Sequence, residues 1–114
     1  MTRRREETDM QDGIRQAAEA LGYLTYHTYD SRRCTPGFPD LWILGFGKLI
    51  VPELKAGKNK TTEAQDRWIS ELRAAGVDAR VYHADQWRKR DLVYELVRIK
   101  REYIRENNSR TIIR

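Results

Sequence analysis

The sequence predicts an α/β domain in which a mixed β-sheet is flanked by helices. Helix-type and strand-type hydrophobic patterns follow one another in the order αβββαβ. Two short apolar runs around a glycine-containing turn indicate a β-hairpin in the middle of the chain. A further apolar stripe adds a long C-terminal helix over about 85–107. The 114 residues are therefore expected to form one domain, with its core at about 6–87.

The first helix is predicted over 6–21 and the first strand over 23–28. Met10, Ile14 and Leu21 recur at helical spacing, and Gly22 provides the stop signal. The β-rich segment that follows Gly22 alternates as a half-buried strand does. This places a helix and a strand ahead of the hairpin.

A polar loop over 29–37 joins the first strand to the hairpin. It carries Arg32 and Arg33, and guanidinium groups suit bidentate contact with phosphate. We interpret both arginines as candidate nucleic-acid ligands. The alternative is that each is an ordinary solvated loop residue.

The hairpin is formed by 41–44 and 48–51 around a Phe46-Gly47 turn. In a two-residue hairpin of this kind, opposed positions have numbers that sum to about 93. Asp40 then lies opposite Glu53, and Lys55 shares the face of Glu53. The sequence therefore predicts two carboxylates and a lysine side by side.

After the hairpin, a basic loop leads into a second helix that begins at Thr62 and ends near Gly76. Thr62 and Gln65 have the spacing of a capping box. Lys58 and Lys60 in the loop are candidates for contact with a nucleic-acid backbone, and simple exposure is the alternative. A last core strand over 77–83 precedes the C-terminal helix.

Adjacent carboxylates repel each other, so their pairing calls for a compensating charge. A hard divalent cation such as Mg²⁺ takes carboxylate oxygens as ligands. Lys55 would favour the ionised form of Asp40 and Glu53 and could orient a water molecule. The alternative is an edge hairpin with solvated charges.

A third acidic group comes from the first helix. Glu6 and Glu7 both fall near its apolar face, whereas Asp9 points away. Such an acid either stabilises the helix N-terminus through the dipole or completes a metal site. The residues alone leave the two explanations open.

Composition favours a polyanionic partner and excludes several other classes. The net charge is +5, and residues 86–114 carry all of it, with nine basic and four acidic residues. No apolar run is long enough to cross a membrane, and none follows the basic N-terminus as a secretory signal requires. The single Cys34 excludes an internal disulfide and fits a cytoplasmic setting in a bacterial or phage-infected cell.

The motifs together resemble a known family. Pro39-Asp40 followed by Glu53-x-Lys55 resembles the motif of PD-(D/E)xK nucleases. The stretch from Thr35 to Leu41, and Thr62-x-x-Gln65-x-x-Trp68, resemble the virus-type replication-repair nuclease (VRR-NUC) domains within that superfamily. The resemblance also includes the His-x-x-Asp-Ser-Arg pattern that begins at His27.

The resemblance implies a restriction-endonuclease-like core that uses Mg²⁺ or Mn²⁺ to cleave DNA, with selectivity for branched structures. By analogy with the family, the metal ligands would be Asp40, Glu53, the Leu54 carbonyl and Glu7, with Glu6 in reserve. Lys55 and Gln65 would complete the catalytic set. Two alternatives are a non-catalytic nucleic-acid-binding module with a relic site, and a two-carboxylate hydrolase of the glycosidase type.

The C-terminal helix is expected to join a homodimer. Leu92, Leu96, Ile99 and Tyr103 form a stripe that exceeds what one contact with the core needs. The basic residues around it are expected to face DNA or solvent: Arg98, Lys100, Arg101 and Arg105. The alternative is a monomer whose sheet the helix covers.

Overall fold

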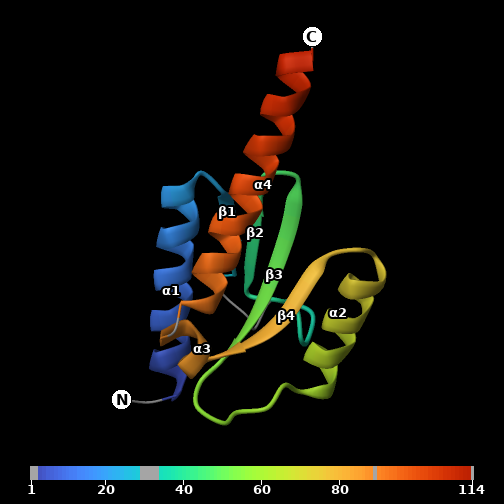
Figure 1. The fold of residues 1–114 in the computed structure, drawn as a ribbon. Helices are drawn as coiled ribbons and strands as arrows, with labels where there is room; N and C mark the ends of the chain where they lie inside the picture. The colour runs from blue at the N-terminus through green and yellow to red at the C-terminus, as the bar shows by residue number, and fades with distance from the viewer. Residues whose placement is uncertain (1–2, 29–33, 89, 114) are drawn as a thin grey trace.

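The predicted α/β architecture is confirmed by a computed structural model, which describes residues 3–28, 34–88 and 90–113. The elements are α1 (Arg3–Leu21), β1 (Leu24–His27), β2 (Leu41–Gly45), β3 (Lys48–Lys55), α2 (Glu63–Ala74), β4 (Asp78–His83), α3 (Ala84–Arg88) and α4 (Asp91–Ile113). The sheet has the order β1-β2-β3-β4 (Figure 1). Its first three strands are antiparallel and β4 runs parallel to β3, so the sheet is mixed.

Helices cover the sheet from both sides, and each side has its own apolar cluster. The larger cluster joins α1, α3 and α4 to the sheet through Met10, Ile14, Ile43, Leu92 and Leu96, among others. The smaller cluster packs α2 onto β3 and β4 through Ile69, Val51 and Ala79. Alternate residues of β3 thus serve opposite layers, as the two-residue period of a strand requires.

The hairpin register agrees with the prediction. Three pairs are formed, namely Ile43 with Ile50, Leu44 with Leu49 and Gly45 with Lys48. Phe46 and Gly47 both have positive φ, at 50° and 75°, as a type I′ turn requires. The Phe46 ring also contacts Tyr23 and Tyr103 edge-on, which fixes the hairpin tip against α4.

The pairing of β2 with β3 stops before the hairpin reaches Asp40. Hydrogen-bonded pairs alternate along an antiparallel ladder, so Gly45–Lys48 and Ile43–Ile50 would be followed by Leu41–Pro52. Pro52 has no N–H to donate, so this pair cannot form its full set of bonds. The two strands are therefore not tied together at the end that carries the acidic residues.

The C-terminal helix differs from the prediction, because it is two helices rather than one over 85–107. The helix is interrupted between α3 and α4, where Arg90 has a φ of 60°. The break lets Ala84 and Leu92 both reach the core, and both are buried. α4 continues to Ile113, and its last turns stand clear of the other elements (Figure 1). None of the described helices is both long and apolar enough to span a membrane.

The apolar stripe of α4 is used largely within the monomer. Leu92, Leu96 and Ile99 are at most 3% exposed, and Tyr103 packs on Phe46. The apolar surface of α4 that is left for a second subunit is therefore smaller than the sequence suggests. The dimer stays a prediction.

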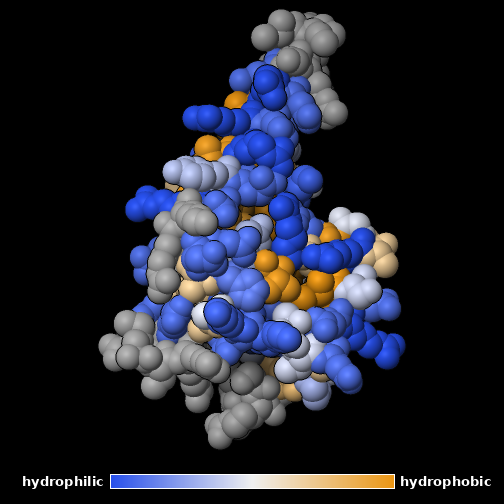
Figure 2. All heavy atoms as spheres, turned by 60° about the horizontal axis from the view of Figure 1, so that its bottom comes forward, coloured by the Kyte–Doolittle hydropathy of each residue, from blue (hydrophilic) through white to orange (hydrophobic). Residues whose placement is uncertain are grey.

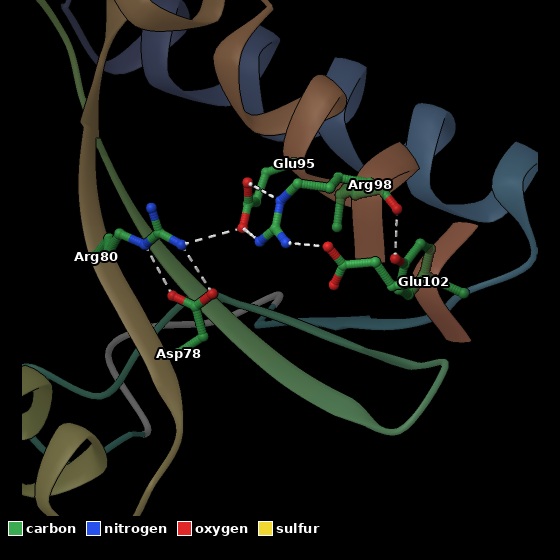
Figure 3. A network of polar contacts seen from close by, with 7 residues as sticks. Asp78, Arg80, Glu95, Arg98 and Glu102 are labelled. Atoms are coloured by element: carbon green, nitrogen blue, oxygen red, sulfur yellow. Dashed lines mark hydrogen bonds and ion pairs between the residues drawn. The ribbon is translucent and has the colours of Figure 1, made fainter. Parts of the chain in front are cut away.

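Polar contacts attach α4 to β4 on the outer side (Figure 3). Arg80 forms a bidentate pair with Asp78, at 2.9 and 3.0 Å, and its Nη2 lies 3.5 Å from Oε1 of Glu95. Arg98 pairs with Glu95 and Glu102 along the helix. Arg98 is exposed to solvent, as one of its two predicted alternatives requires, but its charge is paired with these two acids. Lys100 instead turns inward and donates to the Leu21 carbonyl at 2.8 Å.

Gly37 positions the segment that leads to Asp40. Its φ is +79°, and a Cβ atom added there would lie 2.4 Å from the Ala64 carbonyl carbon and 2.7 Å from the Gln65 nitrogen. Both atoms belong to the backbone of the first turn of α2, which cannot move aside as a flexible side chain can. Only glycine lets the two segments approach this closely.

We expect Gly37→Ala to destabilise the fold by about 2 kcal/mol or more, because left-handed strain and a backbone clash add together. Gly76→Ala is the matched control, since Gly76 also has positive φ, at 87°, but no atom lies within 4 Å of an added Cβ. Urea unfolding of both variants measures the difference. Equal losses would contradict the close approach of Gly37 to α2.

Candidate functional site

The acidic residues predicted from the sequence lie around one cavity of about 320 Å³. Most of its lining residues belong to the N-terminal part of α1, to the start of β2 and to the end of β3. These parts of the elements lie toward the lower end of Figure 1. Glu7, Asp40, Glu53 and Leu54 all line it. Seen from this end, the surface is mostly hydrophilic, with one hydrophobic patch right of centre (Figure 2).

Glu53 is the most deeply buried of the acids, with 7% of its surface exposed. Its Oε1 accepts a hydrogen bond from Gln65 Nε2 at 2.8 Å and lies 3.9 Å from Lys55 Nζ. The pKa of Glu53 is raised to about 7, mainly by burial; the charge of Lys55 lowers it, and the negative charges of Asp40 and Glu7 raise it. Both contacts reach Oε1, so within the described residues Oε2 is the oxygen left for a ligand.

Asp40 precedes β2 and lies beside Glu53. Its backbone carbonyl accepts a hydrogen bond from the Thr28 N–H at 2.9 Å, which continues the contact between β1 and β2. The pKa of Asp40 is raised by burial of the carboxyl group and by the charge of Glu7, and Lys55 lowers it. The residue as a whole is exposed, so its carboxylate is accessible from the cavity mouth.

Glu7 reaches the cavity from α1. Its Oε2 accepts hydrogen bonds from the Ala56 N–H at 3.2 Å and from Asn59 Nδ2 at 3.4 Å. These bonds join α1 to the chain directly after β3. Glu6 and Asp9 are not among the lining residues, so of the three acids Glu7 occupies the position that the resemblance implies.

Gln65 fulfils both functions that its sequence position suggests. The capping box at Thr62 is present, with the Thr62 N–H donating to Gln65 Oε1 at 2.9 Å and the Gln65 N–H donating to Thr62 Oγ1 at 3.1 Å. The amide nitrogen of the same side chain holds Glu53. The helix cap and the acidic site therefore share one residue.

The predicted nucleic-acid ligands are not brought together in the same way. Lys58 and Lys60 are exposed on the loop between β3 and α2, away from the cavity lining. Arg32 and Arg33 lie outside the described residues. Their contact with nucleic acid stays a prediction.

Further residues complete the cavity beyond the predicted site residues. Thr8, Gln11 and Asp12 line it from α1, and His27 and Thr28 line it from β1 and the residue after it. A signal for Gln11 was present, because it lies four residues after Glu7 and so on the same helical face. Pro52 was also visible in the sequence as an interruption of the ladder.

The residues present fit a hard divalent cation. Asp40, Glu53 and Glu7 supply carboxylate oxygens. Burial and the charges of neighbouring acids raise the pKa values of Asp40 and Glu53, and a bound positive charge would favour their ionised forms. In the described parts of the chain, no three His, Cys, Asp or Glu side chains are gathered closely enough to hold a metal by themselves. The carboxylates would therefore be joined by water and by backbone oxygen such as the Leu54 carbonyl, as Mg²⁺ prefers.

The raised pKa of Glu53 makes the stability of the metal-free protein depend on pH. The group titrates near 4.5 when unperturbed and at about 7 in the fold. Between these values the folded state binds more protons than the unfolded state, so the free energy of unfolding falls as pH rises. The loss should be complete above about pH 7 and on the order of 3 kcal/mol.

We expect Glu53→Gln to remove this loss, because the variant side chain stays neutral. Urea unfolding in a chelator, from about pH 5 to about pH 8, gives the difference between wild type and variant. The difference should grow with pH in favour of the variant. A difference that does not change with pH would show that Glu53 titrates as an exposed carboxyl.

Known proteins are similar to this chain in sequence and in fold. The VRR-NUC domain family model matches residues 6–86. Fanconi-associated nuclease 1 of Danio rerio is 36% identical over 56 residues, which are 47% of this chain and 6% of that protein. A solved VRR_NUC domain structure is 28% identical, with a TM-score of 0.59 over 74% of this chain and 91% of the other. The chain thus spans a small fraction of the curated relative but nearly all of the solved domain, and it belongs to the VRR-NUC family of nuclease domains.

Proposed function

We propose that this protein is a divalent-metal-dependent endonuclease that hydrolyses phosphodiester bonds in DNA. The observation that carries the proposal is buried Glu53, held by Lys55 and Gln65 and facing one cavity together with Asp40 and Glu7. A binding surface for phosphate gains nothing from buried carboxylates, because like charges repel. The same set argues against a relic module that only binds nucleic acid.

Each residue has a distinct proposed task. Asp40, Glu53, Glu7 and the Leu54 carbonyl would hold Mg²⁺ or Mn²⁺, which supplies Lewis acidity and lowers the pKa of bound water. Gln65 fixes the rotamer of Glu53, and its own position is fixed by the helix cap. Lys55, 9% exposed, would orient the attacking water or stabilise charge on the phosphate.

We further propose selectivity for branched DNA in replication, repair or recombination, which follows from the resemblance to the family. The C-terminal excess of positive charge supports a polyanionic substrate. Arg101 and Arg105 on α4 are exposed, and neither forms an ion pair within the described residues. Of the four basic residues predicted on this helix, these two are the candidates that remain for contact with the DNA backbone.

The test is a panel of labelled DNA structures incubated with Mg²⁺, Mn²⁺ or a chelator. Wild type should cleave only with metal, and Asp40→Asn should lower kcat by at least about a hundredfold, because a proposed metal ligand is lost. Asp40→Asn should remain folded by circular dichroism. Cleavage by Asp40→Asn at the wild-type rate would refute the proposal.

The assignment of Glu7 has its own control on the same helix. Glu7→Gln should weaken metal affinity, read as the metal-induced rise in melting temperature, by about ten- to a hundredfold. Asp9→Asn removes an equal charge outside the cavity and should leave metal affinity unchanged. Glu6→Gln as the more harmful variant would reassign the helix acid.

We retain the homodimer as a proposal. It rests on the resemblance to the family and on the apolar side chains of α4 that remain exposed. Tyr103 and Ile104 each remain 42% exposed, and Tyr94 66%. One site cuts one strand, so paired cuts in a branched substrate need two copies. Light scattering at micromolar concentration should give twice the chain mass. If the protein has the mass of a monomer, and if adding DNA does not bring in a second subunit, the homodimer is refuted. α4 would then only cover the sheet.

A further inference from the structure

Four of the side chains that line the cavity are polar but not acidic, and we call the part of the lining that they form the neutral half. Thr8 and Gln11 border this half from α1, and His27 and Thr28 border it from the β1 side. The whole cavity, at about 320 Å³, is at the lower end of the range for small-ligand sites. The candidate metal ligands use only part of it, so the neutral half needs a separate explanation.

Thr28 has a hydrogen-bonding group without a partner. Its Oγ1 is buried, and no donor or acceptor within the described residues satisfies it. Its backbone N–H is bonded to the Asp40 carbonyl, so the hydroxyl is held next to the acidic site. A buried polar atom without a partner is costly, and a ligand atom at this place would remove that cost.

Gln11 offers a second available group. It is half-buried, lies one helical turn after Glu7, and its amide forms no hydrogen bond within the described part of the chain. An amide presents a donor and an acceptor together, which is the pattern that pairs with the edge of a nucleobase.

The charge of the cavity decides which part of a nucleotide fits there. Four acidic side chains and no lysine or arginine line the cavity, and Asp12 among them is paired with Arg15 at 3.6 Å. A phosphate away from the metal would therefore meet mainly negative charge. A neutral group is not repelled. The neutral half therefore suits a base rather than a second phosphate.

We propose that this half is a subsite for the base of the nucleotide adjoining the scissile phosphate, with Gln11 and Thr28 as specificity-determining residues. The inference rests on the proposed nuclease function and adds a substrate class to it. A base can enter the cavity only if it leaves the stack, which costs least when it is unpaired. The preferred substrate is then DNA with an unpaired nucleotide next to the cut.

The test uses three DNA substrates of one sequence that differ only at the nucleotide adjoining the cut, which is paired, unpaired, or unpaired and abasic. Wild type with Mg²⁺ should cleave the unpaired substrate with a kcat/KM about tenfold above the other two. Gln11→Ala and Thr28→Val should each lower this preference by about fivefold. Gln16→Ala, an exposed glutamine on the same helix, should retain it.

Binding provides a second readout that does not depend on cleavage. With 2-aminopurine at the unpaired position, binding by wild type in Ca²⁺ should raise the fluorescence, because the base leaves the stack. Gln11→Ala should give a smaller rise, and Gln16→Ala the full one.

Each outcome separates the two proposals. If wild type cleaves the abasic and unpaired substrates equally, or if Gln11→Ala keeps the full preference, the base subsite is refuted and the nuclease function stands. If Gln16→Ala loses the preference as well, the effect belongs to α1 as a whole, and the subsite is again refuted. If wild type cleaves none of the substrates, both proposals fail.

Discussion

The missing N–H of Pro52 is the constraint on which the site depends. β3 is paired with β4 from Ile50 to Lys55, including the pair of Pro52 with Arg80, so the strand itself remains in place. On the other side β2 is released from β3 just where Leu41 would bond to Pro52. Beyond this point the two strands can separate, which places Asp40 and Glu53 at the border of a cavity. With a residue that donates at position 52, the ladder could continue and close this gap.

Burial of Glu53 connects the chemistry of the site to the stability of the fold. An acid that is 7% exposed is tolerated because Gln65 and Lys55 both contact it. Gln65 can do so because Thr62 fixes its other end in the helix cap. A substitution at Thr62 would therefore disturb an acid that it never touches. Helix initiation and catalytic geometry are coupled through one amide.

The sequence was informative wherever a local rule decides the structure. The register of the hairpin follows from a two-residue turn, and the capping box at Thr62 follows from residue spacing. The helical wheel alone left Glu6 and Glu7 as alternatives, because only the position of the loop after β3 selects Glu7. The pairs of Arg98 with Glu95 and Glu102 have helical i,i+3 and i,i+4 spacing and could have been read from the sequence. The partner of Lys100 is a carbonyl at the end of α1, so spacing could not reveal it.

The break between α3 and α4 could not be predicted for a different reason. The segment contains neither Gly nor Pro, and Arg90 adopts positive φ because the core selects it, since both Ala84 and Leu92 must be buried. The same holds for the neutral half of the cavity. Thr28 and Gln11 are ordinary residues on a strand end and a helix, and only the assembled fold shows that they border one space.

The projecting end of α4 has a consequence for engineering. The molecule is 52 Å long, and the N-terminus and the free end of α4 lie at opposite ends of the fold (Figure 1). α4 also lies outside residues 6–86, which the family model matches. A fluorescent reporter or targeting module attached behind Ile113 would sit far from Glu7 and leave the cavity mouth unobstructed. The same module placed ahead of α1 would sit beside that mouth and compete with DNA for it.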